Sequence, residues 1–338
     1  MNNWQSLTVQ ERQQLIQNIS YQTGLSPHAI EKDWWVTMAL KALFQTSCSD
    51  FLLFKGGTSL SKGWNLIERF SEDIDLAIDR SFFGMEGELS KKARTELRKK
   101  SCHFIKNDLA AELDKCLHEL DIVDYQIIVL ESTVSDADPQ ELFIAYTSLF
   151  PKIEYIPSQV KIEMSCRSMR EPFETVSIHS VIADSYPNED FSDPAFELNI
   201  VSPKRTFLEK IFLLHEEFQL HRPHANRMSR HLYDVEKLMK TEFAEQALQD
   251  TELYVSIVKH RVAFNKWQDV DYRRHHPSMI RIVPPSSVEK EWESDYKNMQ
   301  GLFIYGDSLS YKQLIKRLSE LEEQLHDITI DDEFFLMG

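Results

Sequence analysis

Two aspartates, Asp73 and Asp75, stand two residues apart in an apolar segment of this 338-residue sequence. Ile74, Leu76 and Ile78 alternate with them, a period-two pattern that predicts a strand. On a strand the two carboxylates lie on one face, about 7 Å apart. Carboxylate oxygens are ligands that Mg²⁺ prefers, and two such ions can stabilise the attacking and leaving oxygens of a displacement at phosphorus. The pair favours metal-dependent phosphoryl or nucleotidyl transfer, although such pairs also occur on solvated strand faces.

A Gly-Gly turn precedes this strand. Gly56 and Gly57 follow a short apolar strand expected over Phe51–Phe54. Backbone N–H groups in a glycine turn at the start of a helix can hold phosphates. The helix is expected to begin at Thr58 and to carry apolar residues at i, i+4 and i+7, namely Leu60, Trp64 and Ile67. A Gly-Gly pair is often only a turn, but its position before the two aspartates suits a nucleotide site.

Two strings in this region resemble a known family. KGGTSLSK at 55–62 and RFSEDIDL at 69–76 are similar to the signature of the AbiEii/AbiGii abortive-infection toxins, also called domain of unknown function 1814. That family consists of nucleotidyltransferases of the DNA polymerase beta-like superfamily, related to the MenT toxins of mycobacteria. The resemblance implies that Asp73 and Asp75 are catalytic metal ligands. It also implies a triphosphate site, made by Gly56, Gly57, Thr58 and Ser71.

The length and composition predict a folded protein of two domains, or of one large domain with an appendage. Hydrophobic residues make up 42% of the chain, enough for a sizeable core. We expect an α+β fold in which a polymerase beta-like domain, residues 1–200, has a mixed sheet flanked by helices, and residues 201–338 form a mainly helical domain. No apolar run is long enough for a membrane span, the N-terminus lacks a signal-peptide pattern and the four cysteines are scattered. We therefore expect a cytoplasmic protein with no membrane contact.

The first 50 residues predict two helices, at about 9–22 and 27–45. The second contains Glu31, Lys32 and Asp33, which are expected to be surface or helix-pairing charges rather than catalysts. The string of these three residues before an aromatic residue is similar to one in AbiEii-like proteins. That similarity gives none of the three a role.

A basic segment follows the central block. Residues 91–106 carry seven lysines and arginines against one acid, Glu96, in a chain with a formal net charge of −16. Lys91, Arg94 and Arg98 share one helical face, which suits an RNA backbone. A solvated helix with no partner is an equally good interpretation. The overall acidity argues against nonspecific nucleic-acid binding and allows for a basic protein partner.

Residues 122–182 change to short β-rich runs, which should complete the sheet. In the run Val160–Met164, alternation places Lys161 and Glu163 on one face. Polymerase beta-like enzymes often take a third carboxylate from a later strand, and Glu163 is the candidate metal ligand here. A structural ion pair of Glu163 with Arg167 or Lys161 is the alternative.

The C-terminal part supplies a lysine and an aspartate. Ser202-Pro203 opens a helix that contains Lys210, a residue type that usually extends to the surface from such a helix. The string 203–210 and the string RHLYD at 230–234 are similar to the family's later motifs. By that resemblance Lys210 is catalytic and contacts the nucleotide phosphates, and Asp234 orients Lys210 or the acceptor. A buried lysine with an aspartate partner keeps its charge, which suits a triphosphate.

The resemblance implies an enzyme that uses an NTP with Mg²⁺ or Mn²⁺. In MenT-like relatives the acceptor is the 3′ end of tRNA, so an RNA acceptor is expected here, and a toxin implies a cognate antitoxin protein and a role in phage defence. Two alternatives remain open. One is nucleotidyl transfer to a small molecule or a protein side chain, and the other is an NTP-binding regulatory protein without turnover.

Overall fold

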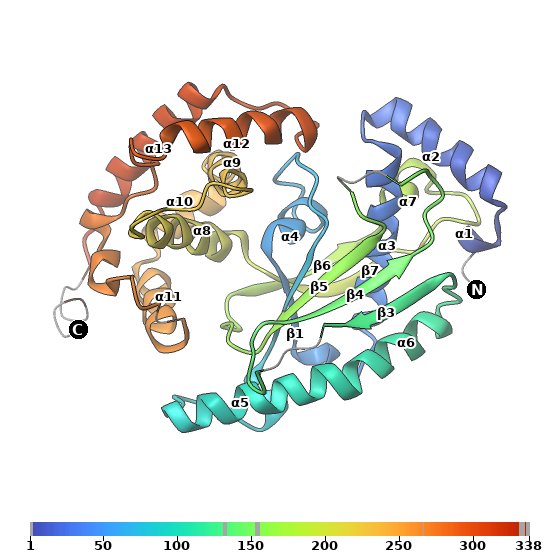
Figure 1. Cartoon of the computed structure of the whole chain (residues 1–338), viewed down its shortest axis with the longest axis horizontal. Coiled ribbons are helices and arrows are strands. Elements are labelled where there is room, and N and C mark those ends of the chain that lie inside the picture. Colours follow the sequence, from blue (N-terminus) through green and yellow to red (C-terminus); the bar gives the residue numbers. More distant parts are fainter. Residues whose placement is uncertain (1–2, 131–133, 153–155, 266, 331–334, 336–338) are drawn as a thin grey trace. The chain divides into compact units, whose positions relative to one another are not determined.

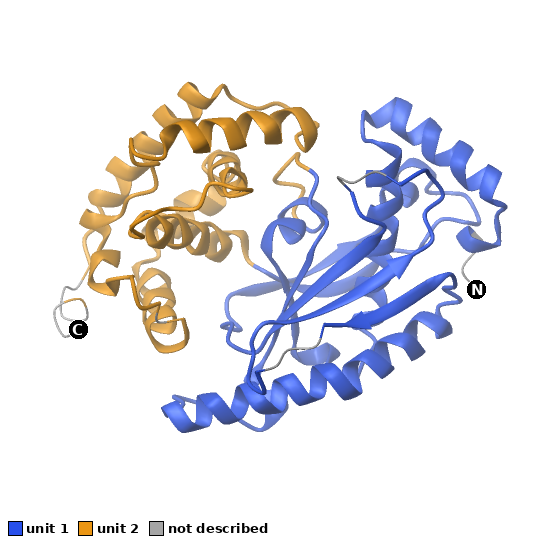
Figure 2. Cartoon of the chain, in the orientation of Figure 1, with its two compact units in different colours: residues 1–63, 70–201 blue, residues 64–69, 202–338 orange. Residues whose placement is uncertain are grey.

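The structure is a computed structural model of the 338-residue chain (Figure 1). It describes all residues except 1–2, 131–133, 153–155, 266, 331–334 and 336–338. The chain forms two compact units (Figure 2): unit 1 comprises residues 1–63 and 70–201, and unit 2 comprises residues 64–69 and 202–338. No helix within the described ranges combines the length and apolar character needed to cross a membrane.

Unit 1 is built on one mixed sheet, whose described strands follow the order β3-β4-β5-β2-β1-β7-β6. The pairs β2–β5 and β1–β7 are parallel, and the other neighbours are antiparallel. The predicted strands are confirmed, while β7 was missed even though Phe196, Leu198 and Ile200 alternate with polar residues. The strands are β1 Leu52–Lys55, β2 Ile74–Ile78, β3 Tyr125–Val129, β4 Gln140–Tyr146, β5 Gln159–Ser165, β6 Phe173–Ile178 and β7 Phe196–Val201.

The two predicted N-terminal helices are confirmed, and their capping residues explain where they begin. The side chains of Thr8 and Glu11 form a reciprocal capping box at the start of α2. Ser26 caps α3, which has Pro27 in its first turn and packs against β5, α6 and α7. The helices of unit 1 are α1 Asn3–Ser6, α2 Val9–Thr23, α3 Pro27–Leu43, α4 Gly56–Lys62, α5 Lys91–Phe104, α6 Ala110–Glu119 and α7 Val181–Ser185.

The helix after the Gly-Gly pair is shorter than the sequence predicted. It begins at Gly56 itself and ends at Lys62, so Trp64 and Ile67 lie outside it. Asn65 adopts a left-handed conformation with φ 50°, which a continuing helix does not allow. Trp64 instead packs edge to face on Phe243 of unit 2. Leu60, Trp64 and Ile67 therefore do not share one helical face. Leu60 lies in α4 of unit 1, whereas Trp64 and Ile67 belong to unit 2.

The basic segment forms α5, which continues through one π-helical turn at Ile105–Leu109 into α6. Figure 1 shows the two helices as one long rod. Lys91, Lys92 and Lys99 are exposed. Arg98, expected on the free basic face, is instead paired with Asp136 at 2.6 Å.

Unit 2 is mainly helical. Its last helix, α13, buries a leucine stripe at Leu314, Leu318, Leu321 and Leu325. The first, α8, begins after Ser202 with Pro203 at its first position, as predicted. The helices are α8 Pro203–Glu217, α9 Ser229–Leu238, α10 Glu242–Gln249, α11 Thr251–Phe264, α12 Glu289–Leu302 and α13 Tyr311–His326.

Candidate active site

Asp75 lies in the middle of the sheet. It is opposite Lys55 on the antiparallel neighbour β1 and opposite Glu163 on the parallel neighbour β5. Ile74 and Leu76, on the other face of β2, are fully buried. Asp73 comes immediately before the first residue of β2, and both aspartates are only partly buried. The sheet therefore places Asp75 beside Glu163, and Asp73 lies just before the N-terminal end of β2.

Gly56 packs directly against Asp75. Its φ is +80°, in the left-handed region that favours glycine, and a Cβ at this position would lie 2.9 Å from Asp75 Cγ and overlap Oδ2. A side chain at residue 56 would occupy the space in front of the carboxylate. The close approach explains why glycine is needed here and brings the beginning of α4 to the aspartate strand.

Hydrogen bonds join the first turn of α4 to the residues before β2. Thr58 Oγ1 donates to the carbonyl oxygen of Asp73 at 2.5 Å and lies 2.9 Å from Ser71 Oγ. Thr58 is buried and Ser71 is partly buried. Gly56, Thr58, Ser71, Asp73 and Asp75 thus come together, as the two sequence strings suggested.

Glu163 is near Asp75 but already has a cationic partner. Lys161 Nζ lies 3.2 Å from Glu163 Oε2 and 2.8 Å from Glu141 Oε1. Arg167, the other partner considered for Glu163, instead pairs with Asp138. Glu163 is therefore placed for either role, as a third metal ligand or as one of two carboxylates that contact Lys161.

The donor set suits a hard divalent cation. Among the residues that the structure describes, no three His, Cys, Asp or Glu side chains are gathered into a ready-made metal cluster. Mg²⁺ is usually held by one or two carboxylates together with water and substrate phosphates, and does not need an all-protein cage. Asp73 and Asp75 provide such carboxylates beside the glycine-lined space at Gly56. These residues fit an ion that binds together with a nucleotide.

Unit 2 contains a second cluster, formed by Lys210, Asp234 and Arg69. Lys210 Nζ lies 2.8 Å from Asp234 Oδ2, and the Arg69 guanidinium donates to Oδ1 at 2.7 Å and to Oδ2 at 2.8 Å. Asp234 is fully buried and Lys210 is 6% exposed. Lys210 is therefore not an ordinary surface lysine, and its ammonium group is in direct contact with the Asp234 carboxylate.

Burial and neighbouring charges together set the pKa shifts in this cluster. Burial lowers the pKa of Lys210, and the Asp234 carboxylate opposes that shift. Burial alone would raise the pKa of Asp234, but Arg69 and Lys210 outweigh it and hold that pKa far below its ordinary value. His231, 3.5 Å from Lys210 Nζ, has a pKa lowered well below its ordinary value, by burial first and then by Lys210. Asp234 is ionised at neutral pH, and His231 is neutral.

Arg69 is the member that sequence reasoning missed. It stands in the string RFSEDIDL, but its partner Asp234 is 165 residues away, so no local pattern reveals the pair. The segment around it is firmly held within unit 2. Glu68 pairs with Lys237 at 2.7 Å and its carbonyl oxygen accepts from Tyr305 N at 3.0 Å, while Arg69 forms an isolated β-bridge with Ile304.

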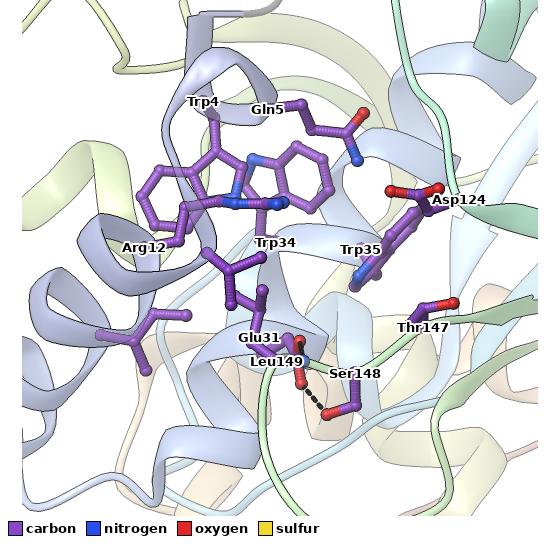
Figure 3. A pocket seen from close by; sticks show the side chains of 12 residues that line it. Trp4, Gln5, Arg12, Glu31, Trp34, Trp35, Asp124, Thr147, Ser148 and Leu149 are labelled. Atoms are coloured by element: carbon purple, nitrogen blue, oxygen red, sulfur yellow. Dashed lines mark hydrogen bonds between the residues drawn. The ribbon is translucent and has the colours of Figure 1, made fainter.

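A separate cavity of about 270 Å³ lies in unit 1 (Figure 3). Trp4, Trp34 and Trp35 give it aromatic walls, and Arg12 and Glu31 supply charge. Neither Asp73 nor Asp75 lines it. It is therefore distinct from the carboxylate site.

Comparison with known proteins agrees with the geometry. A family model described as nucleotidyl transferase AbiEii toxin, type IV toxin–antitoxin system, matches residues 39–322. The solved structure of MenT4, a nucleotidyltransferase toxin from Mycobacterium tuberculosis, is similar with a TM-score of 0.52 and 18% identity, covering 97% of this chain and 93% of MenT4. At that identity the likeness shows the shared α+β fold. No curated protein matches. Since the family model spans most of its length, this chain belongs to the AbiEii family of nucleotidyltransferase toxins of type IV toxin–antitoxin systems.

Proposed function

We propose that this enzyme transfers a nucleoside monophosphate from an NTP to an RNA acceptor, such as the 3′ end of a tRNA, in the presence of Mg²⁺ or Mn²⁺. The observation that carries the proposal is the packing of Gly56 against Asp75. This packing brings together two features that nucleotidyl transfer needs. One is the glycine start of α4, which can hold phosphates, and the other is the carboxylate of Asp75, which can hold a metal ion.

The positions of the side chains support the following roles. Asp73 and Asp75 would hold the metal, with Glu163 as a possible third ligand from the neighbouring strand. When bound, the metal supplies Lewis-acid stabilisation of charge on the phosphoryl oxygens. The triphosphate would be held by the hydroxyl and backbone groups at the start of α4 and before β2, namely those of Gly56, Gly57, Thr58 and Ser71.

Lys210 would offset negative charge on the triphosphate, and Asp234 would hold it in position. Arg69 and Lys210 both contact Asp234, which gathers two cationic side chains at one place. Arg69 is only four residues before Asp73, a stretch that spans at most about 14 Å when fully extended. We propose on this basis that the helical domain, residues 201–338, serves the catalytic domain, residues 1–200, through Lys210 and Asp234.

The exposed lysines of α5 support an RNA acceptor. Lys91, Lys92 and Lys99 lie within about 100° of one another around the helix and are exposed in a chain of net charge −16. Phosphates of an RNA would offset this local positive charge. A small-molecule acceptor would have no use for such a surface. Action on cellular RNA in turn implies that the enzyme works in the cytoplasm.

Charge reversal on α5 tests this surface. In a triple variant, Lys91→Glu, Lys92→Glu and Lys99→Glu, we expect a higher KM for RNA and an unchanged KM for NTP. The slope of log affinity against log salt should fall by about two to three, because each lost phosphate contact removes roughly one unit. The matched control changes Lys297, Lys312 and Lys316, exposed lysines of unit 2, to Glu. An equal effect of both triple variants would argue against a specific role for α5.

Label transfer tests the reaction itself. The purified protein is incubated with each α-³²P-labelled NTP and total cellular RNA, with Mg²⁺ or with EDTA, and the products are resolved on a denaturing gel. We expect a tRNA-sized labelled band with one preferred nucleotide, lost in EDTA. Label on a protein would support the alternative of protein modification. NTP binding without any label would support a small-molecule acceptor or a regulatory protein without turnover.

A toxin of this family has a cognate antitoxin, and we propose that this chain is restrained by one and acts in phage defence. Transfer to the end of tRNA would stop translation in an infected cell. The proposal predicts that expression without the antitoxin arrests growth, and that a variant lacking Asp75 does not.

A further inference from the structure

The sequence predicted surface or helix-pairing charges in α3; in the structure none of the three residues is exposed, and Asp33 pairs with Lys62 of α4. Lys32 is 2% exposed and Glu31 is 4% exposed, and Asp33 is partly buried. An unpaired charge is costly to bury, so each of these side chains needs a partner. The partners come from several segments of unit 1, and two of them, Glu72 and Lys62, belong to segments that lead to the carboxylate site.

Lys32 holds the residue next to Asp73. Its Nζ lies 2.5 Å from Glu72 Oε2, and it also donates to the carbonyl oxygen of Pro157 at 3.1 Å. Glu72 is 7% exposed, so the pair is shielded from water on both sides. The ammonium of Lys32 thus fixes the backbone from which Asp73 extends.

Asp33 holds the other end of the glycine helix. One of its carboxylate oxygens accepts from Lys62 Nζ at 2.7 Å and the other from Val181 N at 2.8 Å. Lys62, whose side chain is 6% exposed, is the last residue of α4 and also donates to the carbonyl oxygen of His179 at 3.0 Å. The first residue of that helix, Gly56, is the one that packs on Asp75.

Glu31 is anchored elsewhere. Ser148 Oγ and Leu149 N each donate to its carboxylate at 2.6 Å, and Figure 3 shows the Ser148 contact beside the aromatic cavity. Both partners belong to the loop after β4. Glu31 therefore resembles Lys32 in burial and in its place on α3, but it holds neither α4 nor the residues before β2.

We propose that Lys32 and Asp33 are positioning residues for the nucleotide site: from adjacent positions on α3 they fix the Asp73 segment and the glycine helix relative to each other. The inference rests on the proposed function of that site. A buried ion pair generally adds little stability compared with apolar residues of similar volume, so its contribution here lies in geometry. The hydrogen bond from Thr58 to Asp73 then connects α4 directly to the segment that carries Asp73.

The test uses the full chain and a double variant, Lys32→Met with Glu72→Gln, which removes the pair without leaving a buried charge behind. We measure the Mg²⁺ concentration for half-maximal binding of an NTP analogue with a methylene bridge between its α- and β-phosphorus atoms. In the double variant this Mg²⁺ concentration should rise by about tenfold or more, because loss of groups that orient metal ligands typically lowers metal affinity by about that factor. Asp33→Asn, which weakens the hold on Lys62, should shift it in the same direction.

Glu31→Gln is the matched control. It weakens a buried anchor on the same helical turn, so thermal unfolding should occur at a lower temperature while the Mg²⁺ dependence stays that of the wild type. An Mg²⁺ dependence unchanged in the double variant and in Asp33→Asn, in proteins that remain folded, would overturn the inference. So would an equal shift in Glu31→Gln, because the effect would then follow stability alone. A wild-type chain that binds no NTP analogue with Mg²⁺ would instead overturn the proposed function.

Discussion

Asp75→Ala is expected to abolish nucleotidyl transfer while the chain stays folded. Asp75 lies at the centre of the sheet, with Gly56 against its carboxylate and Glu163 on the adjacent strand. Its removal would withdraw a metal ligand and with it several kcal/mol of charge stabilisation in the transition state, so kcat should fall by about 10³-fold or more. The measurement is the initial rate of label transfer, with circular dichroism and thermal unfolding as evidence of folding.

Glu163→Gln serves as the comparison for that variant. If Glu163 is a third metal ligand, its loss should also lower the rate strongly and raise the Mg²⁺ requirement. If it is only the partner of Lys161, the rate should change little, since Lys161 keeps its contact with Glu141 at 2.8 Å. Wild-type rates in Asp75→Ala, and equally in Asp73→Ala, would contradict the assignment of the aspartates.

Gly56→Ala is expected to lower the rate of transfer strongly, although less than Asp75→Ala, and through geometry alone. The added methyl group would overlap Asp75 Oδ2, and φ +80° is unfavourable for alanine by about 1–2 kcal/mol. Either Asp75 or the start of α4 must move, and a misplacement of about 1 Å at a reacting centre can cost roughly 10²-fold in rate. The rate of transfer at saturating NTP measures this loss.

Gly84→Ala separates the two causes. Gly84 has a similar φ of +70°, but a Cβ there would meet no atom within 4 Å among the described residues. We expect a loss of about 1–2 kcal/mol in the free energy of unfolding and an unchanged rate of transfer. Comparable rates in the two variants would show that the space in front of Asp75 is not needed.

The carboxylate site was readable because its parts are close in sequence. The alternation around Asp75 predicts β2, and glycines directly after an apolar strand predict the turn into α4. The starts of α3 and α8 could likewise be predicted, because a serine followed by proline is a local signal for the first turn of a helix. The periodicity of apolar residues and the residues at helix starts can be recognised without knowing the tertiary structure.

The remaining features depend on residues far apart in the chain. The pairing of Arg69 with Asp234 spans 165 residues, and that of Lys32 with Glu72 spans 40. A lysine in a helix looks the same in sequence whether it is solvated or, like Lys32, buried in an ion pair. The early end of α4 was hidden for the same reason, since the partner of Trp64 is Phe243.

The membership of residues 64–69 in unit 2 has a consequence for biosynthesis. The ribosome must add 165 residues after Arg69 before Asp234 exists to receive it. At roughly 5–20 residues per second this takes about 10–30 s. During that interval the stretch between the glycine helix and the aspartate strand has none of its later partners. A nascent or prematurely terminated chain that ends before residue 234 would therefore lack the cluster of Arg69, Lys210 and Asp234.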